Sequence, residues 1–230
     1  MSSPGVSSLS FGEAALRQRR KDARPQELLD AALELFVEKG YAATRSEEVA
    51  VRAGVSKGTL YRYYPSKEEL LKAVIRSRLS SQIRLGMLEA DEHAGSSASE
   101  LLRRVVAPWW LRVVEGPASG VFKLVVTEAR SFPEIAECYR LEVVEPGRQL
   151  IGSILRRGIA DGEFRADVDV EAAVHSLVLP MVMLCVHRHS LGACAPDGAP
   201  DARAFVEQHI ELFVRGLRAD AAAAPGEARA

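Results

Sequence analysis

Apolar residues recur along most of the chain at three- and four-residue spacing, which is the period of an amphipathic helix. In the first such segment the apolar positions are Leu28, Leu29, Ala32, Leu33 and Phe36. Pro25 suits the first turn of a helix and Gly40 suits the residue after its end, so we expect a helix from about Pro25 to Lys39. Strict alternation of apolar and polar residues, which is typical of strands, is almost absent. The pattern therefore predicts an all-α fold.

Two short helices are expected next. The sequence Thr44-Arg-Ser-Glu47 has the form of a capping box, in which the Thr44 hydroxyl accepts from the Glu47 amide and opens a helix of about eight residues. Gly54-Val-Ser56 then turns the chain, and Ser56 can cap a second helix from Lys57 to Tyr63. Two short helices joined by a glycine turn form the helix-turn-helix pattern.

Longer helices are predicted over the rest of the chain. Ser66-Lys-Glu-Glu69 is a second capping box and opens a long helix with Leu70, Val74 and Ile83 on one side. Beyond Gly95 the expected helical ranges are 98–115, 119–131, 134–160, 169–190 and 201–218. Pro146 lies inside the third of these ranges and should kink that helix, because proline removes one backbone donor.

Composition narrows the class of protein. The chain has 230 residues, of which 47% are hydrophobic and 27% charged, as in ordinary soluble globular proteins. The longest nearly unbroken apolar run, Leu177 to Val186, is well short of the roughly 20 residues that span a membrane. The N-terminus lacks the basic start and apolar core of a secretory signal. Three cysteines without a CxxC pair argue against a disulfide framework or zinc knuckle, so we expect a cytoplasmic protein with no membrane partner.

Charge is unevenly distributed. Residues 1–80 carry 14 Lys and Arg against 10 Asp and Glu, whereas the remainder is acidic. From Val49 to Lys67 there are four basic residues and no acidic one, which suits the neutralisation of phosphates but is also found on simple solvated faces. Leu60 and Tyr64 lie four residues apart, a spacing that favours core positions over contact positions for these two. The charge pattern alone therefore leaves nucleic-acid binding open.

A resemblance to a known family favours nucleic-acid binding over a simple solvated face. The segments that carry it are Leu33-Glu-Leu-Phe36, Lys39-Gly-Tyr-Ala-Ala-Thr44, Glu48-Val-Ala50 and Ala53-Gly-Val-Ser-Lys-Gly-Thr-Leu-Tyr-Arg-Tyr-Tyr-Pro-Ser-Lys-Glu-Glu-Leu70. Together they resemble the DNA-binding head of the tetracycline-repressor (TetR) family over residues 22–82. Tyr64 stands where phenylalanine is more usual, and Val51 stands where a charged residue is common. Residues 132–135 and 158–165 are similar to one TetR-type C-terminal subgroup.

The resemblance implies an all-α homodimer with a three-helix N-terminal head and a larger ligand-binding, dimer-forming body. We expect a flexible arm over 1–21, a DNA-binding domain over 22–82 with its motif at 45–64, a body over 83–219 and a disordered tail over 220–230. By position, the resemblance places DNA contacts at Thr44, Ser56, Lys57, Gly58, Thr59, Tyr61, Tyr63 and Lys67, and we add the basic residues Arg45 and Arg62. The implied function is a sequence-specific DNA-binding regulator, a repressor released from a palindromic double-stranded operator by a small, largely apolar ligand.

The helix expected over 169–190 is apolar around most of its circumference, so it should be buried on two sides. One side can face a second subunit in a four-helix, twofold bundle, although a helix buried entirely within one chain would show the same pattern. The candidate dimer interface consists of Leu177, Met181, Met183, Leu184, Phe205, His209 and Phe213.

Aromatic residues of the body suggest a ligand pocket. The candidates are Trp109, Trp110, Phe122, Phe132 and Tyr139, together with Glu128, whose carboxylate lies among apolar neighbours in the sequence. Each of these residues can equally be an ordinary core or structural side chain.

The remaining candidate chemistry points away from catalysis. His187, His189, Cys185 and Cys194 do not have the spacing of a zinc site, so we expect no metal and no cofactor. Neither a Ser-His-Asp arrangement nor a phosphate-binding glycine loop is visible in the sequence, so we do not expect an enzyme. The alternative is a helical small-molecule-binding or catalytic protein whose DNA-binding head is non-functional.

Overall fold

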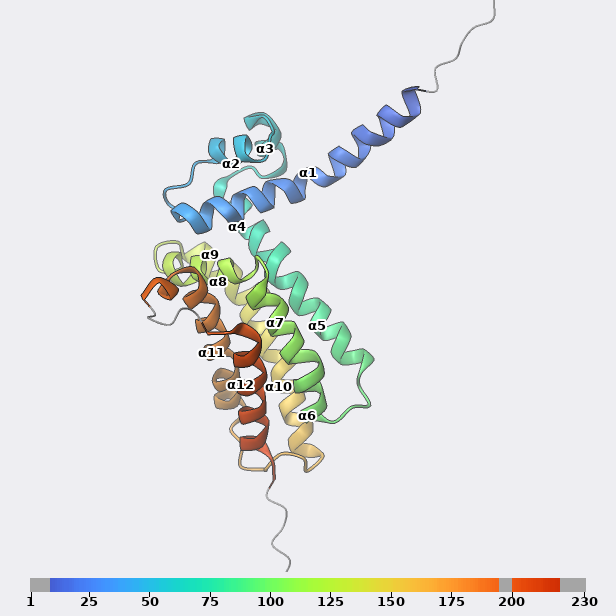
Figure 1. The fold of residues 1–230 in the computed structure, drawn as a ribbon, viewed down its shortest axis with the longest axis vertical. Coiled ribbons are helices and arrows are strands. Elements are labelled where there is room, and N and C mark those ends of the chain that lie inside the picture. Colours follow the sequence, from blue (N-terminus) through green and yellow to red (C-terminus); the bar gives the residue numbers. More distant parts are fainter. Residues whose placement is uncertain (1–8, 195–199, 220–230) are drawn as a thin grey trace, which may run out of the picture. The chain divides into compact units, whose positions relative to one another are not determined.

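The computed structural model describes residues 9–194 and 200–219, and every regular element within these ranges is a helix (Figure 1), which confirms the predicted all-α fold. The chain divides into two compact units, one ending at Val74 and one beginning at Ile75, which we call the head and the body. The expected tail over 220–230 lies outside the described residues.

The head consists of α1 (Leu9–Lys39), α2 (Ser46–Arg52), α3 (Lys57–Tyr63) and α4 (Lys67–Ile75). The first helix is longer than predicted, because it continues through Pro25 instead of beginning there. Most of the expected arm over 1–21 is therefore helical, and residues 1–8 lie outside the described ranges. A proline suits a helix start, but its fixed φ is also helical, so the backbone can continue past it at the loss of one hydrogen bond.

Turns of the helix-turn-helix depend on two left-handed glycines, Gly40 with φ 86° and Gly54 with φ 65°. Ser56 caps α3 as predicted, since its Oγ accepts from the Thr59 amide at 3.1 Å. The predicted capping box at Thr44 is wrong by one position, because the Glu48 carboxylate accepts from the Arg45 amide at 3.1 Å. The helix α2 therefore begins at Ser46, one residue later than a cap at Thr44 implies.

The core of the head is made by the apolar faces of its four helices. Leu60 is fully buried, and the Tyr64 hydroxyl donates to the Pro25 carbonyl at 3.3 Å, so both residues hold α3 on the head as the spacing favoured. The principal buried side chains are Leu28, Ala32, Leu33, Phe36, Val49, Leu70 and Val74. With one face held by Leu60, the opposite face of α3 is turned to solvent.

The body continues from α4 and contains all remaining elements. In chain order these are η1 (Arg76–Ser80), α5 (Ser81–Glu92), α6 (Ala98–Leu101), η2 (Leu102–Val106), α7 (Ala107–Glu115), α8 (Ser119–Glu128), α9 (Pro133–Tyr139), η3 (Arg140–Val144), α10 (Glu145–Ala160), α11 (Val170–His189), the 3₁₀ turn η4 (Leu191–Cys194) and α12 (Ala202–Leu217). The predicted ranges 98–115 and 134–160 each correspond to an unbroken helical run that contains one π turn.

The described residues contain three π turns, η1, η2 and η3, and the last two end two residues before a proline, Pro108 and Pro146 respectively. A proline lacks the amide hydrogen and crowds the preceding turn, and a wider turn at that point relieves the crowding. The disruption expected at Pro146 is therefore seen as a π turn just upstream of it.

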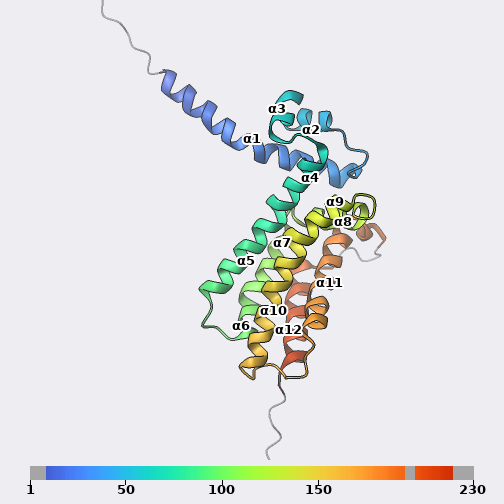
Figure 2. The ribbon, with the colours of Figure 1, turned by 180° about the vertical axis from the view of Figure 1, so that it is seen from behind.

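Helix α11 is the centre of the body. It packs most extensively on α8 and also on α10 and α12, while α12 packs on α7 (Figures 1 and 2). By length and composition, α11 is the one helix among the described residues that could cross a membrane, a test that core helices of soluble proteins also pass. Its packing within the body agrees with a core helix.

Candidate functional site

The N-terminal end of α3 presents an exposed polar surface on the head. Ser56, Lys57 and Gly58 are exposed, Thr59 is half-buried, and Tyr61 retains 37% of its accessible surface. The first turn of α3 is held rigid, because the Ser56 and Thr59 hydroxyls lie 2.9 Å apart and share a hydrogen bond. The helix therefore presents small polar side chains in a fixed arrangement.

Gly58 is not required by the fold of the head. A Cβ built at this position would meet only the Ser56 Oγ, at 3.9 Å, which is an ordinary contact. Its φ is not in the left-handed region either. A glycine at an exposed helix position that neither packing nor backbone conformation demands is typical of a surface that another molecule approaches closely.

Basic side chains flank this surface. Lys57 forms an ion pair with Glu47 and lies 5.7 Å from the centre of the Tyr61 ring, and Arg62 lies 5.3 Å from the centre of the Tyr63 ring. The Lys57 side chain is 59% exposed and the Glu47 side chain 50% exposed, so the ion pair between them is weak. Lys57 can therefore exchange the Glu47 carboxylate for a phosphate. Arg45 is also exposed at the start of α2.

Two of the predicted DNA contacts turn inward. The Lys67 ammonium donates to the carbonyls of Tyr41, Ala42 and Thr44 at 2.9, 3.2 and 3.1 Å, and lies 4.5 Å from the centre of the Tyr41 ring. An ammonium has three hydrogens, so these carbonyls use all of them. Lys67 therefore holds the turn between α1 and α2, and its contact with a phosphate stays a prediction.

Thr44 is the second predicted contact that turns inward. Its side chain is 1% exposed, and its hydroxyl donates toward the carbonyls of Gly40, at 2.8 Å, and Leu35, at 3.2 Å. The hydroxyl therefore binds the last turn of α1 and the residue after it, and a DNA contact by Thr44 stays a prediction.

The body contains a partly open cavity of about 110 Å³. Four of the six predicted pocket residues, Trp109, Trp110, Phe122 and Tyr139, line it together. The sequence analysis missed the other lining residues, which are Ile83, Val143, Val144, Gly147, Arg148, Ile151, Val174, His175, Val178 and Val182. They come from α5, η3, α10 and α11, and no sequence motif marks them.

The four aromatic rings are in contact in a continuous series. Ring centroids are 4.7 Å apart for Trp109 and Trp110, 6.0 Å for Trp110 and Phe122, and 6.4 Å for Phe122 and Tyr139. The first and last pairs are edge-to-face, an arrangement favoured by the ring quadrupoles. The series gives the cavity a rigid aromatic wall.

Polar groups at the cavity are few. The Trp109 indole N–H donates to the Gln82 carbonyl at 2.7 Å, whereas the Trp110 indole N–H is buried without an acceptor among the described residues. Burial raises the pKa of the Tyr139 hydroxyl, which therefore stays protonated at neutral pH. Arg148 lies at the cavity and pairs with Glu171 at 3.0 Å.

Glu128 and Phe132, the other two predicted pocket residues, are not among the residues that line this cavity. Glu128 is the last residue of α8 and is half-buried, and Phe132 immediately precedes α9. The neighbouring Thr127 hydroxyl donates back to the helix, at 3.1 Å to the Lys123 carbonyl. The end of α8 therefore lies away from the cavity that its earlier residue Phe122 lines.

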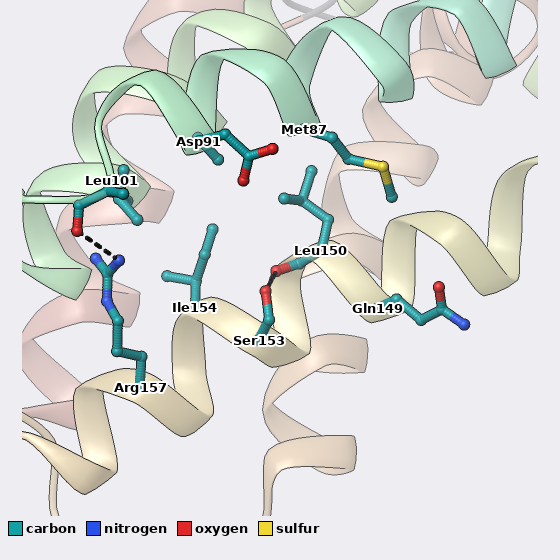
Figure 3. A pocket seen from close by; sticks show the side chains of 10 residues that line it. Met87, Asp91, Leu101, Gln149, Leu150, Ser153, Ile154 and Arg157 are labelled. Atoms are coloured by element: carbon teal, nitrogen blue, oxygen red, sulfur yellow. Dashed lines mark hydrogen bonds between the residues drawn. The ribbon is translucent and has the colours of Figure 1, made fainter.

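A larger, open groove of about 480 Å³ lies where Met87 and Asp91 of α5 face Gln149, Ser153 and Arg157 of α10 (Figure 3). The Arg157 guanidinium donates to the carbonyls of Ala94 and Ser96, so the principal charge of the groove already serves the loop beside it. The groove is open and mixed in polarity, and the smaller aromatic cavity is therefore the better candidate for an apolar ligand.

The predicted dimer interface divides into buried and exposed residues. Leu177, Met181 and Leu184 are 0%, 0% and 6% exposed, so they belong to the core of a single body and not to an interface. Met183 is 54% exposed, and Leu179 and Leu212, which the prediction missed, are each 59% exposed. Phe205 and Phe213 are half-buried, and His209 lies 3.2 Å from the Leu177 carbonyl. One apolar face of α11 and α12 thus remains uncovered.

The cysteines and histidines form no candidate metal site among the described residues. Cys185 is fully buried, and burial raises the pKa of its thiol to about 12. A thiol of that pKa is not a reactive thiolate at neutral pH.

Comparison with known proteins agrees with this architecture. The model of the tetR family of bacterial regulatory proteins matches residues 28–74, and that of the tetracyclin repressor-like C-terminal domain matches residues 95–209. The transcriptional repressor KstR2 of Rhodococcus jostii is 30% identical over 203 residues, which cover 86% of this chain and 92% of the repressor. The fatty acid metabolism regulator protein of Bacillus subtilis is 26% identical over 199 residues, or 86% of this chain and 98% of that protein.

Among solved structures, the regulator FadR of Bacillus subtilis in complex with stearoyl-CoA superimposes with a TM-score of 0.67 at 23% identity, covering 84% of this chain and 99% of that chain. Members of this family bind operator DNA and small-molecule effectors and act as dimers. The predicted family, fold and regulatory function are thereby confirmed. The chain belongs to the tetR family of bacterial regulatory proteins and is a DNA-binding transcriptional regulator.

Proposed function

We propose that this protein represses its target by inserting α3 of two subunits into an operator with twofold symmetry, and that a long-chain acyl compound in the aromatic cavity weakens that binding. The observation that carries the effector part is the cavity itself, which has an aromatic wall and few polar groups. Support for the acyl class comes from the relatives in Bacillus subtilis, one named for fatty acid metabolism and one bound to stearoyl-CoA.

In the head, Ser56, Gly58 and Thr59 are the candidates to contact base edges, because they are small and lead α3. Phosphate contacts are assigned to exposed cations and aromatic hydroxyls: Arg45, Lys57, Tyr61, Arg62 and Tyr63. Tyr61 and Tyr63 each lie beside a cation, which positions their rings at the edge of the surface. The head therefore separates positioning contacts from sequence-reading contacts.

The size of the cavity suggests how the effector acts. At about 110 Å³ it is smaller than the roughly 300–1,000 Å³ of typical ligand sites, so a long acyl chain must widen it. An effector that binds the widened body better than the narrow one shifts the equilibrium between them. Operator release follows if the widened body is the form that holds DNA less tightly.

Dimer formation is assigned to the uncovered apolar face of α11 and α12. Leu179, Met183 and Leu212 are exposed there, and Phe205 and Phe213 are half-buried beside them. A second copy of the same face would cover these side chains in a twofold bundle. Coverage by a second copy accounts for the apolar character of α11 without a membrane, and we assign the protein to the cytoplasm.

We infer that the body has no catalytic function. Ser119 and His189 do lie together, with Oγ and Nε2 2.8 Å apart, but Ser119 is 1% exposed and its hydroxyl donates to the Gly116 carbonyl at 2.8 Å. A buried hydroxyl that already serves a carbonyl cannot attack a substrate. The pair instead links α8 to the end of α11.

The test is fluorescence anisotropy of a labelled fragment of the gene's own promoter. The protein should bind this fragment, and stearoyl-CoA should release it, whereas coenzyme A without an acyl chain should not. Failure to bind any promoter fragment would contradict the regulatory proposal. Equal release by coenzyme A, or no release by stearoyl-CoA, would contradict the acyl effector.

A further inference from the structure

We propose that the effector carries a hydrogen-bond acceptor, a carbonyl or carboxylate oxygen, and that the indole N–H of Trp110 binds this oxygen inside the aromatic cavity. The inference rests on the proposed function of the cavity as the effector site. It makes Trp110 a specificity-determining residue and excludes pure hydrocarbons as preferred ligands.

The first observation is the burial of the Trp110 donor. Trp110 is 2% exposed and lines the cavity, and its N–H has no acceptor among the described residues. Nearly all buried donors in folded proteins are paired, so an exception needs an explanation. A donor at the wall of a ligand cavity is explained if the ligand brings the acceptor.

The neighbouring tryptophan shows that the fold can satisfy such a group. Trp109 lines the same cavity, and its N–H donates to the Gln82 carbonyl at 2.7 Å. The two adjacent tryptophans thus differ in their donors: the N–H of the half-buried Trp109 serves the backbone, and that of the buried Trp110 has no acceptor among the described residues. This difference provides a matched control within one chain.

The other polar side chains at the cavity can also donate hydrogen bonds to a ligand. Tyr139 can donate its hydroxyl hydrogen, and Arg148 and His175 lie at the same cavity. The described residues that line it include no Asp or Glu. The lining therefore offers hydrogen-bond donors, which complement an acceptor oxygen, while the charge of Arg148 is already paired with Glu171.

The experiment observes the two indole N–H groups directly, since the chain has two tryptophans. ¹⁵N-labelled dimer is titrated with cyclohexanone and with methylenecyclohexane, which share one shape but differ in a carbonyl oxygen. Six-membered rings suit the cavity, because an engineered cavity of about 150 Å³ binds benzene. Trp110→Phe and Trp109→Phe assign the two resonances, and either variant alone is sufficient for the assignment.

Cyclohexanone should shift the Trp110 indole resonance downfield, whereas the hydrocarbon should not. The ratio of ketone affinity to hydrocarbon affinity should fall roughly threefold to tenfold in Trp110→Phe. Trp109→Phe also changes the cavity wall, but it should alter the affinity for both probes by the same factor and so leave their ratio as it was. Binding of both probes with the same preference in all three proteins would overturn the inference but leave the cavity as effector site, because a water or ring face would then serve the donor. Absence of any indole shift with either probe would overturn the inference and the proposed cavity together.

Discussion

The head and the body present binding sites of opposite construction. The candidate DNA-binding surface of the head comes almost entirely from one seven-residue helix, α3. Its polar side chains are exposed on one face, and Leu60 packs into the core on the other. The cavity of the body is assembled from α5, α7, α8, α9, η3, α10 and α11, with aromatic and aliphatic walls. A site on one short helix keeps its chemistry contiguous in the sequence, whereas a site between several helices disperses it.

The forces differ in the same way. Binding at the head should be dominated by phosphates and be sensitive to salt, and binding at the cavity should be dominated by apolar burial and be insensitive to salt. Changes in one region should therefore alter one type of binding, unless they act through the dimer.

The largest effect is expected at the dimer face. Leu179→Lys places a charge on the uncovered face of α11 and should give monomers in light scattering. Specific operator affinity should fall about 100-fold or more, because specific complexes exceed non-specific ones by roughly 10³–10⁷. Leu88→Lys is the matched control, since Leu88 on α5 is 58% exposed against 59% for Leu179. A dimer that survives Leu179→Lys would refute the assigned interface.

A second change separates fold from function within the head. Gly58→Ala should raise the melting temperature slightly, by the roughly 0.4–1 kcal/mol gained when glycine is replaced at a compatible position. It should lower operator affinity about tenfold, because a Cβ at the leading end of α3 would prevent close approach to base edges.

Gly216→Ala provides the control for this change. A Cβ at Gly216 meets nothing within 4 Å in α12, so the variant should gain similar stability with unchanged DNA binding. Unchanged operator affinity in Gly58→Ala would show that α3 does not approach DNA by this end.

The smallest effect distinguishes the two lysines of the head. Lys57→Ala should lower the slope of log affinity against log salt by about 0.9, as expected for one lost phosphate contact. Lys67→Ala should leave the slope unchanged and instead lower the thermal stability, because the Lys67 ammonium holds three carbonyls of the α1–α2 turn. A reduced salt slope in Lys67→Ala would instead support a phosphate contact by Lys67.

The errors of sequence reasoning follow from this same difference between regions. The fold class, the helix-turn-helix and the exposure of Lys57 and Arg62 could be predicted, because local period and capping residues determine them. The inward turn of Thr44 and Lys67 could not, because it depends on which carbonyls of a folded turn lack partners.

In the body, a helix that is apolar on all sides gives no sign of which side faces its own core. Leu177 and Leu179 are chemically identical and two residues apart, yet one is fully buried and the other 59% exposed. The same limit applies to Arg148 and His175, whose place at the cavity depends on how α10 and α11 pack.

The central claim is that an effector in the body weakens DNA binding by the head without occupying the DNA-binding surface. Calorimetry of stearoyl-CoA with the dimer, in the presence and absence of saturating operator, tests it directly. Thermodynamic linkage requires that operator weaken effector binding by the same factor by which effector weakens operator binding, typically about 5- to 150-fold. Coupling of that size in both titrations, retained in Lys57→Ala, is the predicted result. Equal effector affinity with and without operator would contradict the account.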